Sequence, residues 1–166
     1  MLRLSKKADY ALIAMNHLAR RQDSPSASTS ARDIAERYDI PIELMAKVLQ
    51  RLVRTGLLVS TQGTRGGYTL SRPSVSISVA DVIQAIDGPF TVTACSTDKH
   101  DCDQYSKCNV RGPLWQIRER IVAALDTVSI AEMAAESEAA PPAAAELAVV
   151  RRSGMSASEG HGPRQG

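Results

Sequence analysis

The three cysteines of this 166-residue chain, Cys95, Cys102 and Cys108, lie within one short segment, and the sequence has no others. The residues between them are polar and offer almost nothing to bury, so a hydrophobic core cannot organise the segment. Thiolates bind soft metal centres such as zinc and iron–sulfur clusters. The segment therefore predicts a metal or cluster site with the three thiolates as ligands.

Three arrangements of these cysteines fit their spacing. Zinc could be bound by the three thiolates together with His100, which completes a tetrahedral set. An iron–sulfur cluster could be bound by the thiolates and a weaker fourth ligand. A disulfide with one spare thiol is disfavoured in the reducing cytoplasm, which we expect because the first residues do not read as a secretory signal. Spacing alone does not separate zinc from a cluster.

Charge is divided unevenly along the chain. Residues 1–75 carry twelve Lys and Arg but six Asp and Glu, whereas the remainder carries eight basic and twelve acidic residues. A basic N-terminal half is typical of a nucleic-acid-binding module, although an ordinary solvated surface can carry the same charge. The overall net charge of +2 excludes a bulk polycation or polyanion. No apolar run approaches the roughly 18 residues of a membrane span, so no membrane partner is expected.

Hydrophobic spacing predicts three helices in the N-terminal half. The first is capped by Ser5 and ends near Gln22. The second is short and begins with Ser30 and Asp33 as a capping-box pair. The third follows a break at 39–41, and its apolar positions are Leu44, Met45, Val48, Leu49 and Leu52. Two short helices joined by a tight turn form a helix-turn-helix, whose second helix enters the major groove of DNA.

Two strand-like segments follow at 57–59 and 68–70, separated by a polar, glycine-rich loop. A hairpin directly after a helix-turn-helix makes a winged helix, and its tip can contact phosphates or the minor groove. The residues expected to contact DNA lie on the third helix and on this loop: Glu43, Leu44, Lys47, Gln50, Arg51, Gln62, Gly63 and Arg65.

Two further helices are expected. Ser78, Asp81 and Gly88 bracket a helix over 79–87, and a longer helix begins at Pro113. The apolar side of the longer helix consists of Trp115, Ile117, Ile121, Val122, Leu125 and Val128. Such a broad apolar side is poorly covered in a small monomer, which predicts a dimer interface.

The expected fold is mostly α with a small β-hairpin wing: a winged helix-turn-helix followed by a long dimerisation helix. Residues 1–88 form the DNA-binding domain, 89–111 the cysteine-containing cluster loop, and 112–133 the dimerisation helix with a terminal cap. Residues 134–166 are rich in Ala, Pro, Ser and Gly and bury too little apolar surface to fold, so we expect a disordered tail.

Several segments resemble the Rrf-two-type (IscR/NsrR) family of iron–sulfur-sensing winged-helix regulators, from residue 1 to about residue 133. They are LRLSKKADY at 2–10, RGGY at 65–68 and ISVADVIQAIDG at 77–88. Within the family, TACS at 93–96, WQ at 115–116 and VSIAEM at 128–133 resemble regulators of SUF iron–sulfur assembly operons. The resemblance implies a cytoplasmic homodimer on a near-palindromic operator in promoter DNA, and it favours an iron–sulfur cluster over zinc.

The resemblance also bears on the fourth ligand and on the wing. The best-known assembly regulator has a ligating histidine where this chain has Arg111, and a guanidinium cannot ligate. In nitric-oxide-sensing members an aspartate of the partner subunit serves instead, and Asp9 holds that position, with His100 as the next candidate. In the wing, many relatives have an arginine at the position of Gln62, so Arg65 would take over its contact.

These observations predict a transcriptional repressor of iron–sulfur assembly genes whose DNA affinity follows the state of a cluster, 2Fe–2S in preference to 4Fe–4S. One alternative is a nitric-oxide- or redox-responsive repressor of the same family. Another is a constitutive DNA-binding protein with structural zinc. An enzyme or electron-transfer protein is disfavoured, because the sequence has no nucleotide-binding glycine loop and no credible catalytic dyad.

Overall fold

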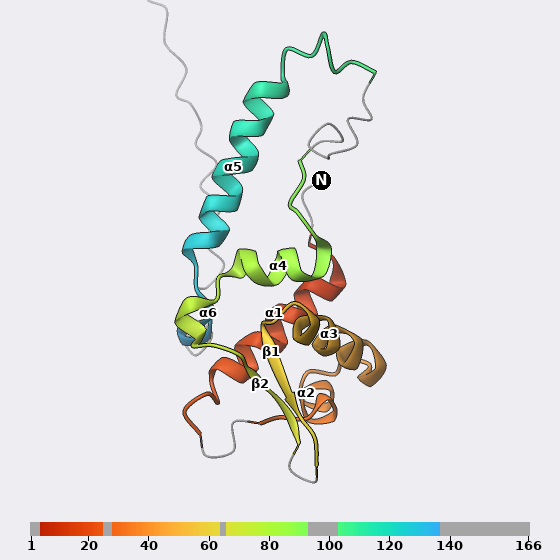
Figure 1. The fold of residues 1–166 in the computed structure, drawn as a ribbon, viewed down its shortest axis with the longest axis vertical. Helices are drawn as coiled ribbons and strands as arrows, with labels where there is room; N and C mark the ends of the chain where they lie inside the picture. Colours follow the sequence, from red (N-terminus) through yellow and green to blue (C-terminus); the bar gives the residue numbers. More distant parts are fainter. Residues whose placement is uncertain (1–3, 25–27, 64–65, 93–102, 137–166) are drawn as a thin grey trace, which may run out of the picture.

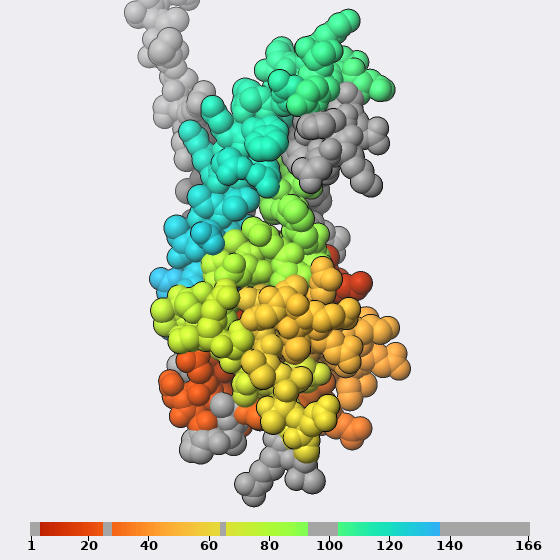
Figure 2. Space-filling view, viewed as in Figure 1, coloured from red at the N-terminus to blue at the C-terminus, as the bar shows by residue number. Residues whose placement is uncertain are grey.

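The computed structural model describes residues 4–24, 28–63, 66–92 and 103–136 of the chain (Figure 1). The helices are α1 (Lys6–Ala19), α2 (Ala31–Arg37), α3 (Ile42–Arg54), α4 (Val79–Asp87), α5 (Arg111–Thr127) and α6 (Ile130–Glu136), with strands β1 (Leu58–Thr61) and β2 (Gly67–Leu70) and a 3-10 turn, Ser74–Ser76. Helices α1 to α4, α6 and the hairpin form a rounded body, from which α5 projects (Figures 1 and 2). The predicted architecture, mostly α with a β-hairpin wing, is confirmed.

Short polar side chains fix where the helices begin. The Ser30 hydroxyl accepts a hydrogen bond from the Asp33 amide (3.1 Å), and the Asp33 carboxylate accepts one from the Ser30 amide (3.3 Å). Ser78 and Asp81 form the same capping box at α4. These pairs satisfy amides that the first helical turn leaves without partners. The starts of α2 and α4 are therefore encoded locally, as predicted.

The α2–α3 turn forms at the predicted break. Asp39 adopts a left-handed conformation with φ of 51°, and the Ile40 amide donates to the Ala35 carbonyl (3.0 Å). Pro41 occupies the N-cap position of α3 and so precedes its first turn. Because the turn buries Ile40 in the core, it fixes the direction of α3 relative to α2.

Helix α3 packs one face against α1, α2 and α4. Its fully or nearly fully buried residues are Met45, Val48, Leu49 and Leu52. Leu44, which also fits the apolar spacing, is an exception with 37% of its surface exposed. The opposite face of α3 is polar and exposed, so the packed face holds the helix against the core while its outer surface faces solvent.

The wing is anchored to the linker between α1 and α2. Strands β1 and β2 pair antiparallel, with Leu58 opposite Leu70 and Thr61 opposite Gly67. Thr29 forms an additional antiparallel bridge with Tyr68, whose amide donates to the Thr29 carbonyl (2.9 Å). This bridge joins residues that lie far apart along the chain, so it is a feature of the tertiary structure.

Helix α5 begins at Arg111, two residues before the predicted start at Pro113. A proline is tolerated there because the first amides of a helix have no partner within it. Helix α1 likewise ends at Ala19 rather than Gln22, because the amides of Arg21 and Gln22 form tighter i→i−3 bonds.

Helix α6 returns the chain to the body. The Ile130 amide donates to the Ile77 carbonyl (2.8 Å), and the Ile130 side chain is completely buried. Ser129 and Glu132 form a capping pair at the start of α6, and its hydrogen bonds lower the pKa of the Glu132 carboxyl. Helix α6 runs to Glu136, so it includes the first residues of the segment expected to be a tail. None of the helices in the described part of the chain has the length and apolar character needed to cross a bilayer.

His17 is the buried titratable group of the body. Its Nδ1 lies 3.2 Å from the Tyr38 hydroxyl, and its Nε2 has no hydrogen-bond partner within the described residues. Burial lowers the pKa of His17 below its usual value, and nearby Arg37, Arg21 and Arg20 lower it further, against a smaller opposite effect of Asp33. The folded protein therefore favours the neutral imidazole of His17.

We expect stability to fall as the pH decreases below about 6.5, the unfolded-state pKa of histidine. Below that pH His17 is protonated in the unfolded chain but still neutral in the native protein. The free energy of unfolding therefore decreases until the native histidine is also protonated. Thermal unfolding of wild type and His17→Gln between neutral and mildly acidic pH measures the effect. The variant should lose part of the pH dependence, and an identical profile for both proteins would contradict the assignment to His17.

Candidate DNA-binding face and cysteine segment

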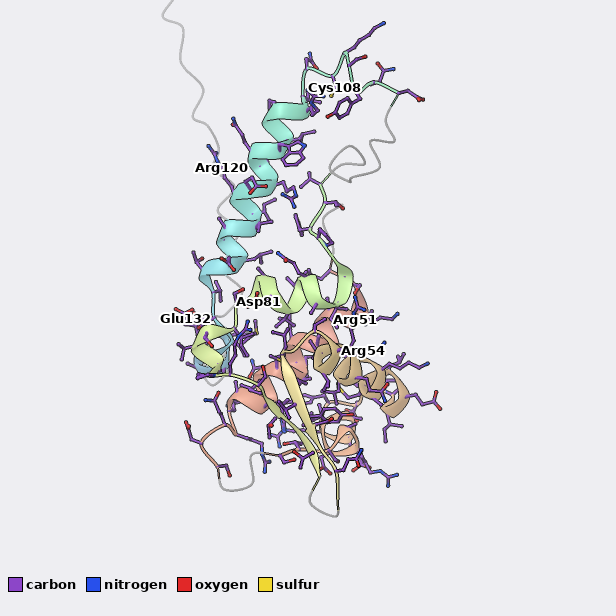
Figure 3. The ribbon with its side chains drawn as sticks, in the orientation of Figure 1. Arg51, Arg54, Asp81, Cys108, Arg120 and Glu132 are labelled. Atoms are coloured by element: carbon purple, nitrogen blue, oxygen red, sulfur yellow. The ribbon has the colours of Figure 1, made fainter. Side chains whose placement is uncertain are left out.

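The outer face of α3 carries most of the residues that the sequence assigned to DNA. Glu43, Lys47, Gln50, Arg51 and Arg54 are all exposed. Helix α3 places them on one surface because its buried residues point the other way, into the core. Figure 3 shows Arg51 and Arg54 at this edge of the body. The helix thus presents a polar, largely cationic surface of a size and shape that the major groove admits.

A groove lies on each flank of α3. The first has a volume of about 230 Å³ and is lined by Lys7, Leu44, Lys47, Val48, Arg51 and Ile86, between α3, the start of α1 and the end of α4. The second has a volume of about 270 Å³ and is lined by Gln50, Val53, Arg54, Ser60 and Tyr68, between α3 and the wing. Of the α3 residues predicted to contact DNA, Leu44, Lys47 and Arg51 therefore border the first hollow and Gln50 borders the second.

Arg51 has a structural contact as well as an exposed position. Its Nε donates a 2.8 Å hydrogen bond to the Ala85 carbonyl in the last turn of α4. The same end of α4 binds the start of α1, where the Ser5 hydroxyl donates to the Asp87 carboxylate (2.5 Å). The last turn of α4 therefore contacts both α3 and the start of α1.

The wing tip is described in part. Gln62 and Gly63 are exposed, and Gly63 has a φ of 115°, a conformation that glycine tolerates. Arg65 lies outside the described residues. Strands β1 and β2 run away from α4, past α2 (Figure 1).

The cysteine segment is described at its two ends. Cys108 is a half-buried free thiol just before α5, whereas Cys95, His100 and Cys102 lie outside the described residues. Figure 3 places Cys108 at the far end of the molecule from Arg51 and Arg54. Asp9 is exposed in the first turn of α1. The described residues contain no group of three potential metal ligands, so the predicted ligand set stays a prediction.

Two arginines of α5 donate hydrogen bonds to the described ends of this segment. These contacts were not predicted from the sequence. Arg118 Nε donates to the Phe90 carbonyl (2.7 Å), just after α4. The guanidinium of Arg111 lies over the ring of Tyr105, with 4.3 Å between the guanidinium carbon and the ring centroid, and donates to the Tyr105 carbonyl (3.2 Å). Arg118 lies among the apolar positions of the helix, and an arginine at such a position could have indicated a buried partner.

The fold and this outer face define a winged-helix DNA-binding regulator. Residues 4–136 match the Rrf2 family, described as "Iron-dependent Transcriptional regulator". The chain belongs to the Rrf2 family, in agreement with the resemblance found in the sequence.

Known relatives agree with this placement. The chain is 32% identical over 138 residues to the HTH-type transcriptional regulator IscR of Klebsiella pneumoniae (strain 342), which covers 82% of each chain. It is 34% identical over 134 residues to IscR of Yersinia pseudotuberculosis serotype I (strain IP32953), covering 80% of this chain and 79% of the relative. The chain is therefore an IscR-like transcriptional regulator and not an enzyme.

Solved structures show the same fold. T. potens IscR has a TM-score of 0.64 and 26% identity, covering 82% of this chain and 88% of that one. CymR, the global cysteine regulator of B. subtilis, has a TM-score of 0.65 and 24% identity, covering 82% and 98%. The likeness to CymR concerns the fold alone.

Proposed function

We propose that this protein is a homodimeric repressor of iron–sulfur assembly genes, of the SUF type, whose grip on promoter DNA depends on an iron–sulfur cluster. The observation that carries the proposal is the position of the cysteines. All three lie in the segment that joins the end of α4, which contacts α3, to α5. Any group bound there acts on the connection between the DNA-binding body and α5.

The donor set fits such a cluster. Iron–sulfur clusters are held chiefly by cysteine thiolates, of which this segment supplies three, and a different ligand can complete the set. Cys108 is a free thiol, and the Asp9 carboxylate makes no hydrogen bond within the described residues. In the proposed site Cys95, Cys102 and Cys108 bind the cluster, preferably 2Fe–2S, with Asp9 of the partner subunit or, less favoured, His100 as fourth ligand. When bound, the cluster supplies a redox- and iron-sensitive cross-link.

The exposed apolar side of α5 supports a dimer. No residue of α5 is buried, and Trp115, Ile117 and Val128 are 42%, 45% and 40% exposed. Apolar surface of this kind on a projecting helix marks an interaction site, and a second α5 is its self-complementary partner. In this proposal residues 1–88 bind DNA, 89–111 bind the cluster and 112–133 dimerise.

The described contacts suggest how the two ends communicate. Arg118 ties Phe90 to α5, and the preceding turn of α4 holds Arg51 and Ser5 through Ala85 and Asp87. Binding of a group between Phe90 and Arg111 would therefore bias the angle between α5 and α3. Because two recognition helices must lie one DNA turn apart, a small change of this angle alters operator affinity.

The test compares cluster-loaded and chelator-stripped protein on promoter DNA of iron–sulfur assembly genes. After anaerobic purification we expect iron and sulfide in the protein, and operator affinities of the two forms that differ by about 5- to 150-fold, the usual range of allosteric coupling. Iron and sulfide assays with fluorescence anisotropy measure both. Equal affinities of the two forms would contradict cluster-dependent DNA binding. Zinc without iron or sulfide would favour a constitutive DNA-binding protein with structural zinc.

A further inference from the structure

The groove between α3, the start of α1 and the end of α4 joins cations from two helices. Lys7 comes from α1, and Lys47 and Arg51 come from α3. Leu44, Val48 and Ile86 provide its apolar lining. The groove therefore combines positive charge with an apolar surface, next to the helix expected to read DNA.

The cations of this groove form no ion pair with the part of the chain that the structure describes. Within the described residues no ion pair joins Lys7, Lys47 or Arg51 to a carboxylate. The carboxylate of Asp87, at the end of α4, accepts hydrogen bonds from the hydroxyl and amide of Ser5. Three cations around one hollow, none of them paired with a carboxylate of the described residues, favour an anionic occupant.

Arg51 is held in a conformation suited to such an occupant. Its Nε is bound to the Ala85 carbonyl, which fixes the plane of the guanidinium. The two terminal nitrogens have no partner within the described residues. A guanidinium fixed in this way loses little side-chain entropy when it binds an oxyanion such as phosphate.

The position of the groove identifies the anion. A helix in the major groove has one sugar–phosphate strand on each side, and α3 has one hollow on each flank. We propose that the hollow lined by Lys7, Lys47 and Arg51 seats a backbone phosphate of one DNA strand, with Lys7 as a contact independent of base sequence. The apolar lining packs against the adjoining sugar. This inference rests on the DNA-binding part of the proposed function and not on the cluster.

Lys6 provides a matched control for Lys7. Both lysines are exposed in the first turn of α1 and carry the same charge, but only Lys7 lines the groove. Lys6→Ala and Lys7→Ala therefore change net charge equally and differ only in the contact. Neither lysine side chain makes a hydrogen bond within the described residues, so both variants should fold as the wild type does, which circular dichroism checks.

The experiment measures binding of full-length protein to random-sequence duplex DNA and to a promoter duplex across a range of salt concentrations. For Lys7→Ala we expect the slope of log K against log salt to fall by about 0.9 per bound subunit. One such contact contributes about 8-fold in affinity at about 0.1 M salt. The loss should be similar on both DNAs, whereas Lys6→Ala should change affinity by less than about 2-fold.

Three results would overturn the proposal: an unchanged slope for Lys7→Ala, equal losses for both variants, or a loss confined to the promoter duplex. The first excludes the contact, the second shows diffuse electrostatics, and the third shows that Lys7 reads sequence. Failure of the cluster mechanism is distinguishable. If Lys7→Ala weakens binding but cluster-loaded and stripped protein bind equally, only the proposed cluster switch is contradicted. If the cluster changes affinity but Lys7→Ala has no effect, only the proposed phosphate contact is contradicted.

Discussion

Replacement of Cys102 by alanine is expected to abolish the cluster chromophore while the winged helix stays folded. Loss of one of three thiolates leaves too few soft ligands to retain iron and sulfide. The buried core is built from α1 to α4, β1 and α6 and contains none of the described residues of the 89–111 segment, so we expect its packing not to depend on the cluster. Visible absorbance, with iron and sulfide analysis, measures the first effect, and thermal unfolding measures the second.

Cys102→Ala should also abolish the regulatory response. Its operator affinity should match that of chelator-stripped wild type and no longer change on reconstitution. Ser106→Ala, a change at an exposed position of the same segment, is the control and should behave as wild type. Global unfolding of Cys102→Ala would show that the metal is structural, and a retained chromophore would exclude Cys102 as a ligand.

The second large effect is expected at Gly67, where β2 meets the linker. A Cβ atom at Gly67 would lie 2.7 Å from the Thr29 carbonyl oxygen and 2.6 Å from the Ser28 hydroxyl. The hydroxyl can rotate away, but the Thr29 carbonyl is held by the Tyr68 amide. Gly67→Ala should therefore separate the wing from the linker and destabilise the protein by about 2–3 kcal/mol, as overpacking of a close contact does.

Gly112→Ala is the matched control for Gly67→Ala. Gly112 lies in the first turn of α5, where an added Cβ atom would meet no other atom of the described residues within 4 Å, and alanine is the better helix former. The control should be neutral or stabilising by up to about 0.5–1 kcal/mol. Urea unfolding of both variants gives the comparison. Equal stability of Gly67→Ala and wild type would show that the Thr29–Tyr68 bridge is not a fixed part of the wing.

The family resemblance was recoverable from the sequence because its motifs are local. LRLSKKADY, RGGY and ISVADVIQAIDG are short segments around Asp9, the wing and α4. The cluster ligands and the DNA-contacting residues follow from that resemblance and from residue chemistry, and both stay predictions. Lys7 lies inside the first motif, but nothing in the order of residues shows that it shares a hollow with Lys47 and Arg51.

The sequence by itself determined the helix starts and the course of the chain. Ser30 with Asp33 and Ser78 with Asp81 are caps whose partners lie three residues apart, and the two faces of α3 follow from a 3.6-residue period. Such interactions depend on neighbours along the chain, so local patterns carry them.

Only the tertiary structure decided which distant groups meet. Ser5 binds Asp87, Arg51 binds the Ala85 carbonyl, and Thr29 pairs with Tyr68. Each contact joins groups that are 34 or more residues apart, and several use backbone atoms, which every residue carries and which leave no mark in the sequence. Their geometry exists only once the core has placed α1, α3 and α4 side by side, and that placement creates the cationic groove beside α3.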